Sequence, residues 1–479
     1  MVFEAVKWRE TFGAGQDAAA FDPEADAPGR RYDLATAIRI VRRMETSTTR
    51  GAVFAEIKDK NPLYRLIDWV YSKTGTNTVQ PFLLFVYMLK CGLSLGPFGD
   101  DDSEAVAIAN FDNERHTIDR LAALVPGAHL QRLLLRRRHL FGRGQLRAAL
   151  RLFGAAPRLW PFLSRLAQSH SFMPSARIAS GLAYYTRFSQ LFTERPELNA
   201  AIVASNYSPE ALGLAAAAHR TGRNVIYVNH APVPANGALV PPVLADCAVF
   251  YGETIRQTYE RHSRCTAEVA LIGQPGTARP MEWRDDVRKV GIFLTALTDP
   301  VAVADLVTTI RASHPDVHIL IRNHPVALLK SDFSDIAGRH QNLEITIGNP
   351  LDDEIAACDL IFCGNSGVAL NVLRGGRPVA YFDALDGLSF DYIGFVESNL
   401  ICNVSGWSND LYLRLRLFYT SPGWRRVMQS YDASYDADKA ALESAAAETI
   451  ARYLSPKPGQ DSAAFRAQSP EWQSFPAAI

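Results

Sequence analysis

Two series of alternating strand-like and helix-like segments constrain this chain more than any other feature of its sequence. The first series is clearest after residue 199, where helical patterns separate short apolar runs at 200–205, 224–229, 247–252 and 267–273. The second series starts at 289 and repeats the alternation as far as 383. Strict alternation predicts parallel, doubly wound sheets. We therefore expect an α/β protein with two Rossmann-like domains that face a cleft, joined by the polar stretch 275–286.

Length and composition agree with this architecture. The 479 residues are too many for one ordinary domain, and the 48% of apolar residues can fill large cores. Apolar residues recur at helical spacing within 33–95, before the first strand-like run at 104–111. We predict a tail with a helical addition, an acceptor-side Rossmann-like domain, a nucleotide-donor Rossmann-like domain, and C-terminal helices with a tail, at 1–100, 101–280, 281–410 and 411–479.

Charge and targeting patterns exclude several classes of protein. A formal net charge of zero argues against a nucleic-acid-binding protein that relies on overall charge. The six cysteines form no CxxC pair, which predicts reduced thiols in the core of a cytoplasmic protein. The N-terminus lacks the pattern of a signal peptide, and the most apolar run, 81–89, is too short to span a bilayer. We expect a cytoplasmic protein that is at most peripheral on the inner face of the membrane.

The second series contains a loop of small residues between the strand-like run 360–364 and the next helix. The loop reads Gly364-Asn365-Ser366-Gly367. Small residues let a ligand approach the backbone, and the start of a helix offers free N–H groups to phosphate. In an open α/β sheet the ligand lies at the carboxyl ends of the strands, where this loop falls. The loop therefore predicts phosphate binding, and an ordinary turn capped by Ser366 is the alternative.

A second candidate loop, Arg322-Asn323-His324-Pro325, follows the strand-like run 318–322. His324 can donate a hydrogen bond to a phosphate there, and Pro325 fixes the turn. The alternative is a turn histidine that is bonded to the backbone. We expect His324 and Ser366 to end adjacent strands of one sheet and to contact the same ligand.

Polar side chains also end strand-like runs of the first series. His230 follows the run 224–229 and faces the cleft from the other side. A neutral imidazole there can take a proton from an acceptor hydroxyl, although a structural histidine explains the position equally well. Asp112, Glu114 and His116 follow the run 104–111 and are rival bases, and Asp112 can simply cap its helix.

Together these loops resemble motifs of bacterial capsule and teichoic-acid transferases. The segment 208–232, in which a strand ends in a histidine before a loop, is similar to a segment of those enzymes. Gln274-Pro275, at the domain junction, and His324-Pro325 resemble the paired QP and HP motifs of capsule Kdo transferases. The segment 353–383 is similar to the nucleotide-binding segment of these enzymes, of CDP-glycerol glycerophosphotransferases and of bacterial sialyltransferases.

This resemblance implies a GT-B glycosyltransferase that needs no metal and no cofactor besides its co-substrate. The co-substrate would be a nucleotide-activated donor, CMP- or CDP-linked, from which a sugar or polyol phosphate passes to a cell-surface glycan or lipid-linked acceptor. His230 would be the catalytic base, and the last helix would cross back over the first domain. The donor would be bound at the junction and at the two loops of the second series, by Gln274, Arg322, His324, Pro325, Gly364, Asn365, Ser366 and Gly367.

Two other functions stay open from the sequence. A UDP-sugar 2-epimerase-like isomerase has the same twin-Rossmann frame and a similar Ser-Gly loop, although the Gly-Thr-Arg-Pro opening expected near its N-terminus is absent from this sequence. A non-catalytic glycan-assembly protein would keep the fold without turning over a donor. The three classes differ in what they do to a panel of nucleotide sugars.

The zero net charge of the chain conceals a strongly basic segment. Between Arg120 and Thr193 there are twelve arginines and no Asp or Glu. Within 133–166 these arginines alternate with Leu, Phe and Trp, which predicts a basic amphipathic surface for anionic lipid headgroups or an acidic glycan. We place the centre of that surface at Arg136, Arg137 and Arg138. In the alternative, the apolar residues pack in a core and the arginines are solvated or paired.

Overall fold

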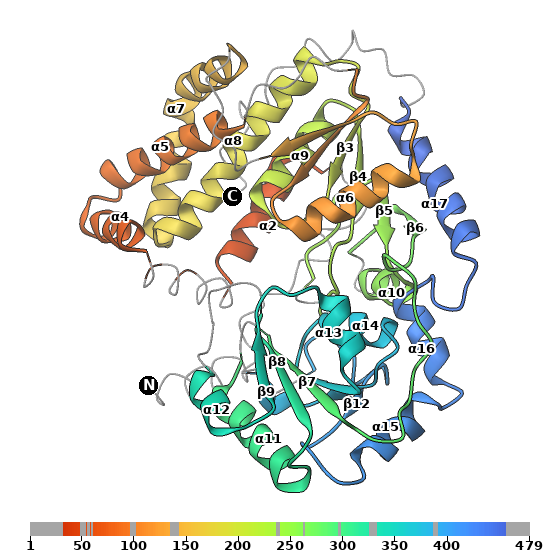
Figure 1. Cartoon of the computed structure of the whole chain (residues 1–479). Helices are drawn as coiled ribbons and strands as arrows, with labels where there is room; N and C mark the ends of the chain where they lie inside the picture. Colours follow the sequence, from red (N-terminus) through yellow and green to blue (C-terminus); the bar gives the residue numbers. More distant parts are fainter. Residues whose placement is uncertain are drawn as a thin grey trace.

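The chain folds into two lobes, one above the other in Figure 1, each built around a six-stranded sheet. The computed structural model describes residues 32–47, 54, 58, 61–95, 102–134, 143–235, 240–261, 264–295, 298–324, 333–386 and 391–456. The paired strands of both sheets run parallel. The predicted α/β fold with two Rossmann-like domains and an N-terminal helical addition is therefore confirmed.

The first sheet has the strand order β2-β1-β3-β4-β5-β6. Its central strands are short, fully buried apolar runs, as expected for a parallel sheet covered on both faces. The order reverses between β1 and β3, and a crevice for ligands opens at such a switch point. The strands and connecting helices are β1 (Ala105–Ala109), α6 (Asp112–Leu124), β2 (Leu130–Leu134), β3 (Ala200–Val203), α9 (Pro209–Arg220), β4 (Asn224–Val228), β5 (Cys247–Phe250), α10 (Glu253–Arg261) and β6 (Glu268–Leu271).

The helical addition packs onto the first sheet through α9. Its described helices are α2 (Leu34–Glu45), α4 (Pro62–Lys73), α5 (Val79–Ser94), α7 (Arg143–Ser169) and α8 (Phe172–Glu194). The buried helix α8 contacts each of the others and also α9. A Cβ atom on Gly213 of α9 would lie 2.9 Å from the Tyr184 Cβ, so α8 and α9 approach where only glycine fits. One continuous hydrophobic core joins the addition to the sheet, so they form a single lobe.

The second sheet has the strand order β12-β11-β10-β7-β8-β9. Counted from its own first strand, β7, this is the order 3-2-1-4-5-6 of dinucleotide-binding Rossmann folds. Its switch point lies between β7 and β10. The elements are β7 (Lys289–Phe293), α11 (Pro300–Ser313), β8 (His318–Arg322), α12 (Ser334–Arg339), β9 (Leu343–Thr346), α13 (Leu351–Ala357), β10 (Leu360–Cys363), α14 (Val368–Arg374), β11 (Val379–Tyr381), the 3-10 turn η3 (Asp383–Leu385) and β12 (Cys402–Asn403).

This order corrects one expectation about the second domain. Ser366 follows β10 and His324 follows β8, but β7 lies between these strands, so the prediction that the two residues end adjacent strands is wrong. Neighbouring strands are about 4.8 Å apart, which separates the two loops by roughly 10 Å. Alternation along the chain predicts parallel strands, but it does not give their lateral order.

The C-terminal helices are divided between the two lobes. Helices α15 (Leu411–Tyr419) and α16 (Trp424–Tyr431) belong to the second hydrophobic core. Helix α17 (Lys439–Leu454) runs up the right side of Figure 1 and adds Ala446, Ile450 and Leu454 to the first core. It packs against β4, β6 and α6, which confirms the expected crossing back.

Several smaller expectations can be checked against the described residues. The predicted tail at 1–30 and nearly all of the C-terminal tail, from 457, lie outside them. All six cysteines are free, five of them buried and Cys265 partly buried. In the part of the chain that is described, none of the helices has the length and apolar character needed to cross a membrane.

Candidate active site

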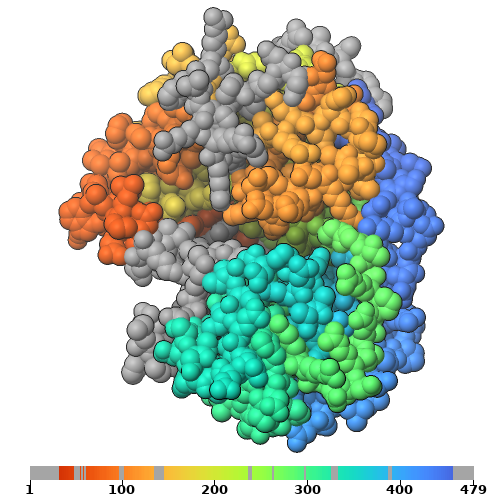
Figure 2. Space-filling view, viewed as in Figure 1, coloured from red at the N-terminus to blue at the C-terminus, as the bar shows by residue number. Residues whose placement is uncertain are grey.

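Loops from the carboxyl ends of both sheets meet between the lobes. A Cβ atom on Gly367, after β10, would lie 3.1 Å from Cγ of Pro232, after β4. The backbone N–H of Ala235 donates to the carbonyl of Tyr392 at 3.0 Å. Figure 2 shows the surface hollowed between the orange upper lobe and the cyan lower lobe. Because ligands of open α/β sheets bind outside the carboxyl ends of the strands, this cleft is the candidate active site.

The loop Gly364-Asn365-Ser366-Gly367 is anchored by an aspartate that sequence reasoning missed. Asp386, which is buried, accepts the backbone N–H of Asn365 at 2.5 Å. A side chain on Gly364 would collide with the Asp386 carboxylate, so only glycine fits there. The Asn365 Oδ1 accepts the N–H of Tyr392 at 2.7 Å. The Asn365 side chain therefore connects its own loop to the loop at Tyr392, which is a structural role.

Gly367 approaches Pro232 of the first domain, and Ser366 directly precedes it in this loop. The N-cap of α14 is Gly367 and not Ser366, as the capping alternative had it, but the Ser366 Oγ accepts the N–H of Val368, the first residue of the helix, at 3.3 Å. A hydroxyl that accepts one hydrogen bond can still donate its own proton. The loop lies at the switch point between β7 and β10, where Rossmann sheets bind nucleotides. The contact with the Val368 N–H and donation to a phosphate are thus compatible roles for Ser366.

In the second candidate loop, after β8, the first residue, Arg322, makes contacts within its own domain. The Arg322 guanidinium forms an ion pair with Glu354 of α13 and donates to the Asn349 carbonyl at 2.9 Å. These contacts hold Arg322 against α13. His324 is partly buried two residues further on, and Pro325 lies outside the described residues. His324 is therefore the residue of this loop that keeps a donor-binding role in our proposal.

His230 is fixed in one orientation at the end of β4. Its Nδ1 lies 2.5 Å from the carbonyl oxygen of Ala204, which follows β3. A carbonyl oxygen can only accept, so Nδ1 carries the proton and Nε2 is left with its lone pair in the neutral ring. The side chain is partly exposed. This arrangement provides a proton acceptor at the cleft edge.

The rival bases after β1 are engaged locally. Asp112 is exposed and forms an ion pair with Arg115 one turn later. Glu114 is buried, and its carboxylate accepts the N–H of Asn110 at 2.6 Å, which caps α6. His116 is exposed on α6. The structure thus brings neither carboxylate into contact with the His230 loop within the described contacts.

A buried acidic cluster lies at the switch point of the first sheet. Glu210, in the first turn of α9, accepts a hydrogen bond from the Asn110 side chain at the end of β1. Arg177 of α8 lies 3.8 Å from Glu210 and donates to Glu45 of α2 at 3.0 Å. Burial raises the pKa of Glu210, although Arg177 acts in the opposite direction. In the sequence Glu210 is simply an acid in a helix start, and only the packing of the helical addition reveals the cluster.

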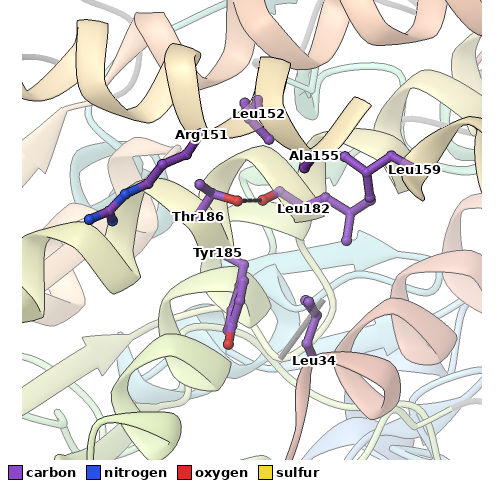
Figure 3. A pocket seen from close by; sticks show the side chains of 8 residues that line it. All are labelled: Leu34, Arg151, Leu152, Ala155, Leu159, Leu182, Tyr185 and Thr186. Atoms are coloured by element: carbon purple, nitrogen blue, oxygen red, sulfur yellow. Dashed lines mark hydrogen bonds between the residues drawn. The ribbon is translucent and has the colours of Figure 1, made fainter. Parts of the chain in front are cut away.

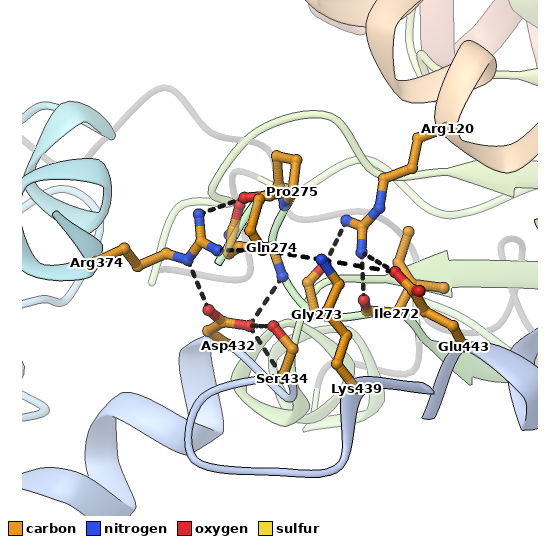
Figure 4. Close-up of polar contacts among 11 residues, drawn as sticks. Arg120, Ile272, Gly273, Gln274, Pro275, Arg374, Asp432, Ser434, Lys439 and Glu443 are labelled. Atoms are coloured by element: carbon orange, nitrogen blue, oxygen red, sulfur yellow. Dashed lines mark hydrogen bonds and ion pairs between the residues drawn. The ribbon is translucent and has the colours of Figure 1, made fainter. Parts of the chain in front are cut away.

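Gln274 lies at the connection between the two domains, beside Asp432 and Arg374 (Figure 4). The buried Asp432, between α16 and α17, accepts the Gln274 N–H at 2.8 Å and the Arg374 Nε–H at 2.7 Å. Arg374 also donates to the carbonyls of Pro275 and Gly276. Asp432 therefore connects the end of the first domain, helix α14 of the second domain and the returning C-terminal segment. The Gln-Pro motif is placed at the interdomain connection, where its backbone is held.

The cavity drawn in Figure 3 is remote from these residues. It lies among α2, α7 and α8 and is lined by Leu34, Arg151, Leu152, Ala155, Leu159, Leu182, Tyr185 and Thr186. Its volume of about 10 Å³ suits a single water molecule and no sugar nucleotide. Among the residues described, no group of three or more His, Cys, Asp or Glu side chains is placed to hold a metal ion. The interdomain cleft remains the candidate site.

Comparisons with known proteins give structural neighbours at low sequence identity. No protein-family model and no curated protein matches the sequence. The UDP-GlcNAc 2-epimerase from Neisseria meningitidis bound to UDP-GlcNAc is 10% identical, with 73% of this chain and 99% of that chain covered and a TM-score of 0.45. The glycotransferase of kitacinnamycin is 12% identical, covering 74% and 100% with a TM-score of 0.42. The lipopolysaccharide outer core galactosyltransferase WaaB in its apo form is 11% identical, covering 73% and 96% with a TM-score of 0.39. The strand order and connections described above define the fold of this chain.

Proposed function

We propose that this protein is a GT-B glycosyltransferase that uses a nucleotide-activated donor. A sugar or polyol phosphate would pass to a cell-surface glycan or a lipid-linked acceptor. The observation that carries the proposal is the geometry of His230, whose Nδ1 is bonded to the Ala204 carbonyl while Nε2 keeps its lone pair at the cleft edge. The loop after β10, which we propose binds the nucleotide, lies with Gly367 against Pro232, two residues after His230.

The chemistry follows from these two loops. His230 Nε2 accepts the proton of the acceptor hydroxyl as that oxygen attacks the donor. Negative charge grows on the leaving phosphate, and the Ser366 hydroxyl and the His324 ring donate hydrogen bonds to it. The roughly 10 Å between their loops, which flank β7, leaves room for the phosphate between them. Closing of the lobes about the Asp432 hinge excludes water, so the donor is transferred and not hydrolysed.

The finer identity of the donor rests on the motif resemblance. The Gln274-Pro275 and His324-Pro325 pairs and the segment 353–383 favour a CMP- or CDP-linked donor, because they resemble enzymes that use such donors. Since Gln274 contributes its backbone to the hinge, the specificity for the nucleotide is expected to come from the loops after β8 and β10. An acceptor of the capsule or teichoic-acid class follows from the same resemblance.

A donor panel tests the proposal directly. CMP-, CDP- and UDP-sugars are incubated with the full chain, with and without glycan acceptors, and release of the nucleotide and the sugar product are measured. We expect release with at least one donor and stimulation by acceptor. Epimerised UDP-sugar without transfer would identify an isomerase, and no turnover of any donor would indicate a non-catalytic protein.

The role of His230 is tested in the same assay. His230→Ala should lower the transfer rate by about a hundredfold or more and keep donor affinity. His129→Ala is the matched control, because His129 is exposed before β2, at the opposite edge of the sheet. If transfer survives in His230→Ala but is lost in Asp112→Asn or Glu114→Gln, the base is a carboxylate.

A further inference from the structure

Exposed apolar side chains concentrate on three helices of the N-terminal addition. Of the fourteen large hydrophobic side chains that are exposed in the described residues, nine lie on α4, α5 and α7. Helix α5 packs against both α4 and α7, and the three form the left edge of the upper lobe in Figure 1. We call the surface formed by their exposed side chains the α4–α5–α7 face. It lies on the opposite side of the lobe from α17.

Helix α7 is apolar on two opposite sides. Leu152, Leu159 and Leu166 recur every seven residues and are buried against the rest of the lobe. Leu146, Leu150 and Phe153, at i, i+4 and i+7, form a second stripe that is exposed, with Leu150 at 61%. One apolar stripe is enough to attach a helix to a core. The second stripe is therefore not explained by the fold.

Helices α4 and α5 continue this exposed stripe. Val79, Phe82 and Val86 of α5 are exposed at i, i+3 and i+7. The Phe153 ring of α7 packs edge-on against Phe85 of α5, with centroids 5.4 Å apart, which brings the two stripes together. On α4 the exposed side chains are Leu63, Leu66 and Trp69. Three helices that pack together thus each expose large apolar side chains, and a concentration of this kind marks an interaction site.

The charges on the same helices are all of one sign where they reach solvent. Helices α5 and α7 contain no Asp or Glu. The one acid of α4, Asp68, is buried and paired with Lys58 at 2.6 Å. Arg151, Arg158 and Arg165 recur every seven residues on the exposed side of α7 and form no ion pair within the described residues. An exposed basic row therefore runs beside the apolar stripe.

We propose that the α4–α5–α7 face docks on the surface of an anionic lipid bilayer. Leu, Val and Phe side chains would enter the boundary of the acyl chains, while the arginines contact phosphate headgroups. Trp69 is a residue type enriched at that interface. A second copy of this chain would set two basic faces against each other, and a nucleic acid offers nothing to the aliphatic stripe. The proposal does not depend on the catalytic role of the cleft, and it rests on described helices, whereas Arg136, Arg137 and Arg138 lie outside the described residues.

Vesicle binding by the full chain tests this proposal with matched variants. The vesicles contain either phosphatidylcholine alone or an equal mixture with phosphatidylglycerol, and the bound fraction is measured by co-sedimentation. The apolar variant is Leu66→Gln/Trp69→Gln/Leu150→Gln, and its control, Val301→Gln/Leu413→Gln/Leu417→Gln, removes equally exposed side chains of the second lobe. The charge variant is Arg151→Gln/Arg158→Gln/Arg165→Gln, and its control, Arg414→Gln/Arg425→Gln/Arg426→Gln, removes the same charge elsewhere.

The expected result is binding to the mixed vesicles that weakens with added salt, and little binding to phosphatidylcholine alone. The charge variant should bind about a hundredfold more weakly, and the apolar variant at least about tenfold more weakly, while both controls bind like the wild type. Circular dichroism and donor turnover report whether each variant is folded. Absence of wild-type binding, or equal loss in variants and controls, overturns the proposal. A wild-type dimer that dissociates in the apolar variant would also overturn it, because the face would then be a contact between copies.

Discussion

Asp432 is the residue whose removal tests the interdomain connection most directly. Its side chain is buried and accepts four hydrogen bonds: from Arg374 Nε at 2.7 Å, the Gln274 N–H at 2.8 Å, and the Ser434 N–H and hydroxyl at 3.0 and 2.6 Å. Asp432→Ala leaves the Arg374 guanidinium buried without its carboxylate. Removing one partner of a buried ion pair costs about 3–5 kcal/mol. We expect the free energy of unfolding to fall by that amount.

The second expected effect is local. Gln274 and the linker after it are held by Asp432 and by Arg374, so both anchors loosen together. Proteinase K, which cuts exposed backbone with little preference for sequence, should then cut faster within that linker, 275–286. The free energy is measured by urea unfolding, and the cleavage rate by mass spectrometry of the fragments. Glu448→Ala is the control, because this acid is exposed on α17, and it should change the free energy by no more than about 0.5 kcal/mol.

The double variant Arg374→Ala/Asp432→Ala separates the ion pair from general damage. It removes both charges, so its cost should be smaller than the sum of the two single costs by at least about 1 kcal/mol. A cost of Asp432→Ala below about 1 kcal/mol, or strict additivity in the double variant, would refute the reasoning. An unchanged rate of cleavage by proteinase K within 275–286 would show that the linker is held by other contacts.

Three further predictions concern the cleft. Ser366→Ala and His324→Ala should each lower donor turnover at least about tenfold, or ~1.4 kcal/mol, and near wild-type kinetics in both would remove them from the donor site. Gly364→Ala should abolish turnover, because its side chain would collide with Asp386, whereas Gly338→Ala, where a side chain meets open space, should not change it. Burial raises the pKa of Glu210, so the folded state binds its proton more tightly than the unfolded state does. The free energy of unfolding should therefore decline as pH rises from the ordinary carboxyl range to the raised pKa. Unfolding measured across that range should lose this pH-dependent decline in Glu210→Gln, and an unaltered profile would assign the decline to another group.

The elements that were predicted well from the sequence are those with a strong local pattern of apolar residues. The buried apolar runs of β3, β4, β5, β7 and β8 are bounded by helix starts or turns, so their limits were within a residue or two. The lateral order of the second sheet could not be predicted, because it depends on the connection from β9 through α13 to β10, which crosses to the other side of β7. The pairing of β12 was missed because two residues leave no periodic signal.

The candidate site divides in the same way. The loop at Ser366 and the position of His230 follow from strand ends, which are local features of the sequence. The partner of Gln274 is Asp432, 158 residues later, and no local pattern connects them. Arg177 and Glu45 reach Glu210 only because the helical addition packs on α9. Contacts between distant segments therefore account for most of what was missed, and the roles of His230, Ser366 and His324 stay predictions.

The return of α17 has a consequence for how the chain folds during synthesis. Domains usually fold in order as they leave the ribosome. Here the core of the first lobe includes Ala446, Ile450 and Leu454, which are among the last of the described residues to be made. In topological terms, the second domain is an insertion within the first. The core of the first lobe can therefore be completed only after the second domain has been synthesised. Until then the apolar surface beneath α17 is uncovered, and chaperones can bind there.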